Sequence, residues 1–274
     1  MKHNFNEHEN NLINSNPEFK SIIDSIDAEY SMSIIKLTHE FGNALTLVNS
    51  SLQIIESSHP EVKRFKYWAS TMGDVHYLVN LISELSFYNH SDKLNLETID
   101  IVSLIQSVIN SYKSTTSENV ISNGKTLCNN ITSKTNSAED EHSNDKCNIP
   151  KIHYNLSCLT PIPEITADNT KLKQVFINLV KNAYEALDFS KSSPSICVEL
   201  SCNNSNLTIS IKDNGQGISP EHLTNIFSPM VSYKSNGTGL GLPISKKIIE
   251  SHNGTISVDS AIGIGTTFII TLPV

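Results

Sequence analysis

The sequence has little glycine, and the glycines it has are unevenly placed. Only Gly42, Gly73 and Gly124 precede residue 200, while the other eight of the 11 glycines follow Asp213. Glycine lets the backbone approach a ligand closely and adopt positive φ angles. This distribution indicates that a ligand is bound in the C-terminal third of the chain.

Cysteine and long apolar runs are also scarce. The five cysteines show no C-x-x-C spacing, and an odd number fits free thiols in a reducing cytosol better than a disulfide framework. No apolar run approaches the roughly 20 residues of a membrane helix, and the N-terminus lacks a signal-peptide core. The net charge of −8 disfavours nucleic acid as the main partner. We therefore expect a cytoplasmic protein with no membrane span.

The N-terminal part predicts a helical hairpin at residues 18–90, after an Asn-rich, disordered arm at 1–17. Apolar residues recur at threes, fours and sevens in two stretches, 18–57 and 61–88, which Pro60 separates. Because two helices cannot bury both seams, we expect a homodimer with a four-helix bundle; the alternative is packing on the C-terminal domain. The seam residues are Ile23, Ile26, Tyr30, Leu37, Ala44, Val48 and Ile55, then Phe65, Ala69, Met72, Val79 and Ile82.

Residues 93–274 predict an α/β sandwich, in which a mixed sheet carries helices on one face. The polar segment 114–150 has few apolar anchors, so we expect a disordered insertion there. Asp168 or Asn169 can cap one of the helices. The expected helices are 101–111, 171–187 and 243–252, and the expected strands lie near 157–159, 196–200, 207–213, 255–260 and 266–272.

Three motifs predict a nucleotide pocket. Asp213-Asn214-Gly215-Gln216-Gly217 is followed by Gly237-Thr238-Gly239-Leu240-Gly241-Leu242. A glycine-rich turn that opens a helix presents backbone N–H groups to an anion. Upstream, Asn178 and Asn182 are four residues apart and share one helix face.

The order of these motifs resembles that of sensor histidine kinases. Segment 168–186 resembles their N box, 213–218 the G1 box, 226–229 the F box, 237–242 the G2 box and 263–268 the final glycine turn. Gyrase-type topoisomerases, mismatch-repair ATPases, chaperones and some serine kinases share this ATP-binding fold. Segment 37–46 resembles the H box, which favours the histidine kinases. The chain departs from the family pattern at Ala44, usually proline, and at Ser232-Tyr233 before Lys234, usually a pair of threonines.

The resemblance implies that the pocket binds ATP and Mg²⁺. Asn182 would give Mg²⁺ a neutral oxygen, and Asp213 would accept a hydrogen bond from the adenine amino group. Lys234 would place positive charge on the γ-phosphate, although a solvated lid lysine is an equal alternative. The implied nucleotide-binding residues are Asn178, Asn182, Asp213, Gly215, Gly217, Lys234, Gly237, Gly239, Gly241 and Thr267.

His39, Glu40 and Asn43 are the predicted catalytic residues. A neutral imidazole is nucleophilic near pH 7, and Glu40 can hydrogen-bond one ring nitrogen of His39 and withdraw its proton. The alternative for His39 is a solvated surface histidine. By resemblance, Asn43 would orient a water that dephosphorylates the partner.

The predicted function is an ATP-dependent protein histidine kinase that autophosphorylates His39 and passes the phosphoryl group to an aspartate of a response-regulator receiver domain. The alternatives are a dimeric phosphatase or phosphotransfer scaffold, and a serine-kinase or ATP-clamp relative. The segment before His39 is short for a sensory domain, so we expect a separate sensor protein or a response of the N-terminal arm.

Overall fold

The computed structural model describes residues 16–89, 93–122, 150–190, 193–203, 205–234 and 237–274. Its contacts divide the chain into two compact units. One unit comprises the chain up to residue 92 with residues 232–240, and the other comprises residues 93–231 with 241–274. Most of the predicted arm, residues 1–15, and most of the predicted insertion, residues 123–149, lie outside the described residues.

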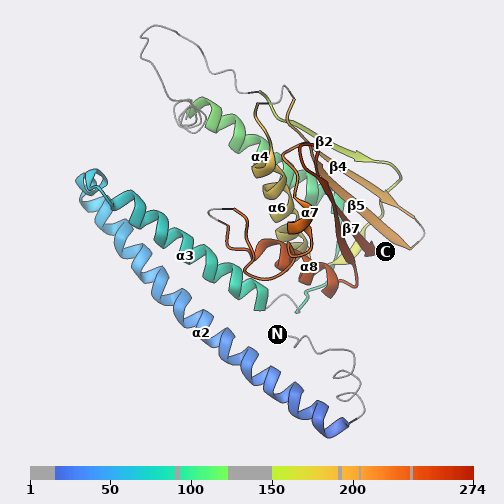
Figure 1. Ribbon diagram of the computed structural model, residues 1–274, viewed down its shortest axis with the longest axis horizontal. Helices are drawn as coiled ribbons and strands as arrows, with labels where there is room; N and C mark the ends of the chain where they lie inside the picture. The colour runs from blue at the N-terminus through green and yellow to red at the C-terminus, as the bar shows by residue number, and fades with distance from the viewer. Residues whose placement is uncertain (1–15, 90–92, 123–149, 191–192, 204, 235–236) are drawn as a thin grey trace. The chain divides into compact units, whose positions relative to one another are not determined.

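The first unit contains a hairpin of two helices, α2 (Pro17–Ser58) and α3 (Trp68–Asn89), which Figure 1 shows side by side. Asn16 caps α2, because its side-chain oxygen accepts from the amides of Glu18 at 3.1 Å and Phe19 at 3.3 Å. Helix α2 therefore begins inside the expected arm. In the described part of the chain, no helix is both long and apolar enough to span a membrane.

The second helix begins at Trp68 and not at the predicted Glu61. Pro60 instead opens a short 3₁₀ helix, η1 (Pro60–Arg64), and Phe65 then adopts an extended conformation that ends it. Proline fixes its own φ angle, which suits the start of a tight turn. The sequence pattern missed this break because Phe65 and Ala69 continue the apolar spacing across it.

A carboxylate holds the hairpin turn together. The indole N–H of Trp68 donates to Glu56 Oε2 at 2.9 Å, and Lys63 Nζ lies 2.9 Å from Glu56 Oε1. The Trp68 hydrogen bond, followed by that of Lys63, holds the pKa of Glu56 below its ordinary value. A lowered pKa in the folded state means that this contribution to stability is present at neutral pH and is lost as the pH falls through the folded pKa.

The second unit is built on a five-stranded mixed sheet in the order β2-β4-β5-β7-β6. Strand β2 pairs in parallel with β4, and the other neighbours are antiparallel, which confirms the predicted mixed sheet. A second, two-stranded sheet of β1 and β3 was not predicted, because strands of three residues are too short to show a periodicity. The strands are β1 (Glu97–Ile99), β2 (His153–Cys158), β3 (Ile165–Ala167), β4 (Ser195–Cys202), β5 (Asn206–Asp213), β6 (Thr255–Ala261) and β7 (Gly265–Pro273).

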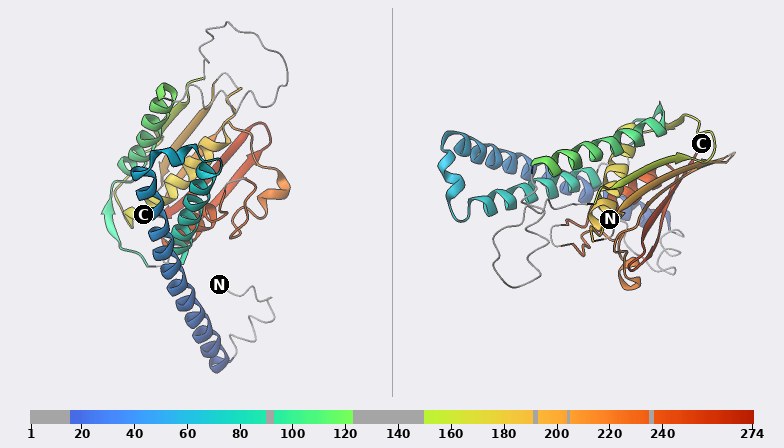
Figure 2. Two further views of the ribbon diagram at one scale, coloured as in Figure 1. Left: turned by 90° about the vertical axis from the view of Figure 1, so that its left-hand side faces the viewer. Right: turned by 90° about the horizontal axis from the view of Figure 1, so that it is seen from above.

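The long helices of this unit cover one face of the large sheet, as Figures 1 and 2 show. Strand residues alternate between two environments. Val198, Ile209 and Ile270 are fully buried beneath the helices, whereas Ser210 and Lys212 belong to the polar opposite face. This alternation confirms the predicted sandwich. The helices are α4 (Ile101–Ser122), α6 (Asn169–Ala186), the short α7 (Pro220–Leu223) and α8 (Gly241–Ser251).

Helix α4 continues to Ser122, eleven residues beyond the predicted end at Ser111 and into the segment expected to be disordered. Apolar residues become sparse after Tyr112, so the periodicity that located the helix no longer marks its end.

Asp168 joins three segments of the second unit. Its carboxylate accepts from the Lys171 amide at 3.0 Å, which confirms the predicted cap of α6, and from the Asn95 amide at 2.8 Å. Its own N–H donates to Nε2 of the buried His252 at 3.0 Å, at the end of α8. The Nδ1 of His252 lies 2.8 Å from the Ile248 carbonyl oxygen, so the ring proton sits on Nδ1.

We expect Asp168→Ala to lower the free energy of unfolding by about 2–3 kcal/mol, because it removes a helix cap and leaves the Asn95 amide without its acceptor. Asp100→Ala is the matched control: Asp100 caps α4 through Val102 and Ser103 but is exposed. It should lower the free energy by less than Asp168→Ala does, because it loses only an exposed helix cap. Urea unfolding of both variants measures the difference, and equal losses would contradict the role of the Asn95 contact.

Candidate functional site

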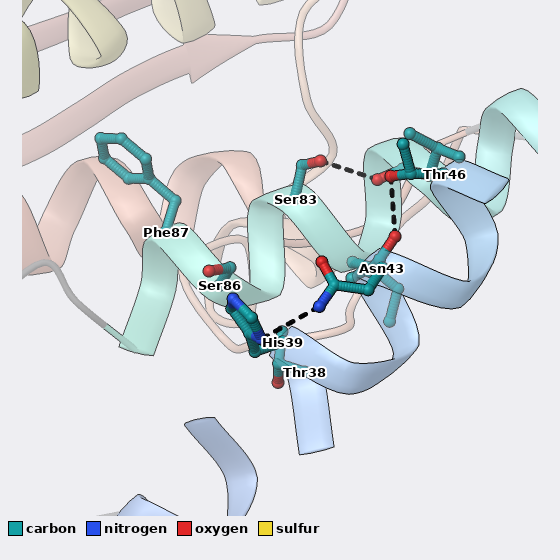
Figure 3. A pocket seen from close by; sticks show the side chains of 10 residues that line it. Thr38, His39, Asn43, Thr46, Ser83, Ser86 and Phe87 are labelled. Carbon is teal, nitrogen blue, oxygen red and sulfur yellow. Dashed lines mark hydrogen bonds between the residues drawn. The ribbon is translucent and has the colours of Figure 1, made fainter. Parts of the chain in front are cut away.

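The hairpin contains a pocket of about 480 Å³ beside His39, between α2 and α3 (Figure 3). Among its lining residues, all within the described part of the chain, His39 alone is ionisable. Its imidazole is exposed and therefore open to an incoming group. The lining residues are Thr38, His39, Gly42, Asn43 and Thr46 from α2, and Val79, Ile82, Ser83, Ser86 and Phe87 from α3.

The ring of His39 contacts Asn43, not the predicted Glu40. The Asn43 Nδ2 lies 3.3 Å from the His39 Nδ1, and Figure 3 shows the two side chains pointing at each other. Residues four apart share a helix face, whereas adjacent residues point in different directions. When Asn43 donates to Nδ1, the ring proton of the neutral imidazole sits on Nε2.

Sequence reasoning missed the α3 wall of this pocket. Ser86 lies next to the His39 ring in Figure 3, and Phe87, which follows it on α3, also lines the pocket. They belong to no motif, and nearly fifty residues separate them from His39. Only the pairing of the helices brings them to the site, so no local signal could have found them.

In the second unit, Asp213 ends strand β5 and is buried. Its Oδ1 accepts from the amides of Gly215 at 2.8 Å and Thr266 at 3.2 Å. These two backbone donors fix the orientation of the carboxylate. Asp213 is therefore a preorganised acceptor at the end of the sheet, the kind of group that selects an amino-bearing base.

Three glycines around Asp213 allow neighbouring backbone segments to pack in direct contact. A Cβ on Gly215 would lie 2.1 Å from the Ala186 carbonyl oxygen, and one on Gly217 would lie 2.1 Å from that of Ala261. A Cβ on Gly265 would meet the Asp213 carbonyl oxygen at the same distance. The turn after β5 is therefore enclosed by the end of α6 and the β6–β7 turn, and only glycine fits these positions.

The turn between β6 and β7 is tied to the same region. Ser260 Oγ accepts from the Ile218 amide at 2.9 Å and lies 2.9 Å from Thr266 Oγ1. Thr267, a predicted nucleotide-binding residue, follows on β7 opposite Lys212 and Asp259. Register places it on the polar face of the sheet.

Asn178 and Asn182 lie one turn apart on α6, as predicted. Asn178 is occupied by protein contacts: its Nδ2 donates to the Gly241 carbonyl oxygen at 3.1 Å, and its Oδ1 accepts from Gln174 at 3.2 Å. The structure thus joins the N-box segment to Gly241, the first residue of α8.

The segment with Lys234, Gly237 and Gly239 belongs to the first unit. Here Ser232 Oγ accepts from the Lys234 amide at 3.2 Å, and a Cβ on Gly237 would lie 2.3 Å from that oxygen. Gly239 has a φ of 70°. Gly237 therefore lies against the Ser232 side chain, which leaves little room for a side chain at this position.

The chain has relatives of known class. Residues 167–274 match the family of histidine kinase-, DNA gyrase B- and HSP90-like ATPases. Sporulation kinase C of Bacillus subtilis (strain 168) is 28% identical over 249 residues, 91% of this chain and 49% of that protein. Sensor histidine kinase ZraS of Escherichia coli (strain K12) is 30% identical over 238 residues, 87% of this chain and 44% of that protein.

The chain contains a histidine kinase core. It spans about half the length of these two relatives. Two solved structures share the fold of this kinase core. Full-length ShkA in complex with AMPPNP superposes with a TM-score of 0.66 at 20% identity, covering 88% of this chain and 45% of that one. Histidine kinase ThkA in complex with response regulator TrrA superposes with a TM-score of 0.53 at 20% identity, covering 93% and 63%.

The crowding at Gly217 predicts a specific loss of nucleotide binding. Gly217→Ala should weaken ADP binding at least about tenfold, because the new methyl group displaces the β6–β7 turn. Gly263→Ala is the matched control: Gly263 has a φ of 77° against 71° for Gly217, but its Cβ would meet nothing within 4 Å. Both variants carry the same backbone strain, so calorimetric titration with ADP isolates the crowding. Equal affinities would contradict the role of the close contact between Gly217 and Ala261.

Proposed function

We propose that this kinase core is an ATP-dependent protein histidine kinase that autophosphorylates His39 and then phosphorylates an aspartate of a response regulator. The observation that carries the proposal is the exposed, uncharged pocket of His39 on a chain that also holds a histidine kinase-like ATPase domain. The neutral ring can attack a phosphorus atom, and the open pocket leaves room for a second protein to collect the phosphoryl group.

His39 needs a different ring tautomer at rest and during its attack on the phosphorus atom. Attack through Nε2 requires that the ring proton be on Nδ1, whereas donation from Asn43 to Nδ1 places it on Nε2. Glu40, the exposed neighbour of His39 in the sequence, is the proposed proton acceptor. We therefore assign the Asn43 contact to the resting state, and we assign Asn43 to holding a water near the partner's aspartyl phosphate.

The nucleotide would bind in the second unit. Asp213 would accept from the adenine amino group, and the glycines around it would leave room for the base. Mg²⁺ fits Asn182 because a single neutral oxygen suffices when the triphosphate supplies further ligands. Lys234 would neutralise the γ-phosphate. The structure of ShkA in complex with AMPPNP supports an ATP site in this fold.

We further propose that the hairpin forms a homodimer. The inner seam of α2, residues 38, 42, 45, 49, 52 and 56, is buried or half-buried against α3. A second heptad seam, residues 37, 41, 44, 48, 51 and 55, stays open: Leu37 is 52% exposed, Phe41 58% and Val48 47%. An open apolar seam with a strict heptad spacing is typical of a coiled-coil interface, and a second copy supplies a matching one. This would complete the predicted four-helix bundle.

His39→Gln should abolish acid-labile labelling from γ-labelled ATP, since glutamine offers no ring nitrogen. ADP binding should stay unchanged, because His39 belongs to the other compact unit. His59→Gln, an exposed histidine at the hairpin turn, is the matched control and should keep full labelling. Acid-labile label on His39→Gln would overturn the assignment. Acid-stable label on the wild type would favour a serine kinase, and no label would favour a scaffold.

Glu40→Gln and Asn43→Ala should separate the two activities. Glu40→Gln removes the proton acceptor and should slow autophosphorylation by about 10²-fold or more. Asn43→Ala removes only the resting contact with Nδ1, so it should not slow autophosphorylation but should prolong the lifetime of a phosphorylated receiver domain. The measurements are initial labelling rates and the decay of labelled receiver in the presence of ADP. If Asn43→Ala slows labelling as much as Glu40→Gln, this division is wrong.

A further inference from the structure

Three side chains connect α6 to the first turn of α8 through a directional chain of hydrogen bonds. Gln174 Nε2 donates to Asn178 Oδ1 at 3.2 Å, and Asn178 Nδ2 donates to the Gly241 carbonyl oxygen at 3.1 Å. Ser245 Oγ donates to the same carbonyl oxygen at 3.0 Å and lies 3.5 Å from Asn178 Nδ2. We call these residues the amide relay.

The relay has a fixed polarity. Gln174 offers a donor, so the oxygen end of the Asn178 amide faces Gln174 and the nitrogen end faces Gly241. A reversed amide would bring its oxygen against the Gly241 carbonyl oxygen, which is an acceptor. Ser245 is fully buried, so it holds its place in the relay without exchanging partners with bulk water. Each member therefore needs the others to keep its orientation.

The relay holds Gly241, the residue at which the second unit resumes after segment 232–240. Gly241 is the first residue of α8, and Leu240 before it belongs to the first unit. The position of the Gly241 peptide sets the direction of the first N–H groups of α8, which under the proposed function face the phosphates of ATP. Asn178 already uses both ends of its amide within the protein.

We propose that Gln174, Asn178 and Ser245 are positioning residues, which fix the first turn of α8 for the phosphates of the bound nucleotide. Asn178 acts through Gly241 and does not touch the nucleotide itself. Gln174 lies in the segment that resembles the N box but has no role assigned to it there, and Ser245 belongs to none of the motifs read from the sequence. This inference rests on the proposed nucleotide site, and it identifies the side chains that hold the first turn of α8 at that site.

The test is Gln174→Glu in the full chain, with ADP and Mg²⁺ as the probe. The new carboxylate keeps the size of the side chain but presents only acceptors, so it draws the Asn178 nitrogen toward itself and turns the oxygen toward Gly241. At pH 8 the dissociation constant for ADP should rise about five- to tenfold, the effect of one lost hydrogen bond to a buried group. At pH 5, within one unit of the ordinary glutamic acid pKa of about 4.3, the loss should shrink, because part of the introduced carboxyl takes up a proton and donates again.

The chain supplies a matched control in Gln106→Glu. Gln106 Nε2 donates to Asn110 Oδ1 at 2.9 Å, which is the same pair at the same spacing on the exposed face of α4. Gln106→Glu should leave the affinity for ADP unchanged at both pH values. A loss for Gln174→Glu that is the same at pH 5 and pH 8, or that Gln106→Glu shares, would overturn the relay.

A double-mutant cycle tests whether Gln174 acts through Asn178 and does not depend on the carboxylate. If Asn178 acts through the relay, Gln174→Ala added to Asn178→Ala should weaken ADP binding no further. Additive losses would mean that Gln174 and Asn178 act independently, which would overturn the relay. A wild-type protein that does not bind ADP would instead refute the proposed function, so the two failures are distinguishable.

Discussion

The close contact of backbone with backbone at Gly215, Gly217 and Gly265 is the constraint on which the nucleotide domain depends. Each glycine lies where a Cβ would come within 2.1 Å of a carbonyl oxygen from another turn. This packing brings the end of α6, the turn after β5 and the β6–β7 turn together around the buried carboxylate of Asp213. Any side chain at these positions would separate the turns and leave Asp213 without its backbone donors.

Neutral polar side chains surround His39 and hold the first turn of α8. The His39 pocket is lined by amide and hydroxyl side chains, and an amide relay holds the start of α8. Such groups orient an imidazole or a helix end without adding a charge that would attract or repel phosphate. Charged pairs lie elsewhere, for example at the hairpin turn, where Lys63 contacts Glu56. This division suits a protein proposed to handle a phosphoryl group twice.

The hairpin uses one helix for two interfaces. Inner and outer seams of α2 follow the same heptad spacing but are offset by one residue. The inner seam packs on α3, and the outer seam is the proposed dimer interface. His39 lies beside the buried Thr38 of the inner seam and one turn from Asn43, so it is exposed next to a packed surface. The packed inner seam keeps the His39 backbone in place, while the His39 side chain remains exposed to a partner.

The sequence by itself determined the mixed sheet, the helix capped at Asp168 or Asn169, the glycine turns and the place of His39 on a heptad helix, because these depend on local spacing and residue chemistry. Only the tertiary structure decided which groups meet. It paired the His39 ring with Asn43 and not with Glu40, since helix geometry places residues four apart on one face. It placed Ser86 opposite His39, 47 residues away in the numbering, and it joined Asn178 to Gly241, 63 residues away. Helix α4 extended beyond its apolar pattern, and α3 began after a break that the pattern concealed, because apolar spacing records which face is buried and not where the backbone turns.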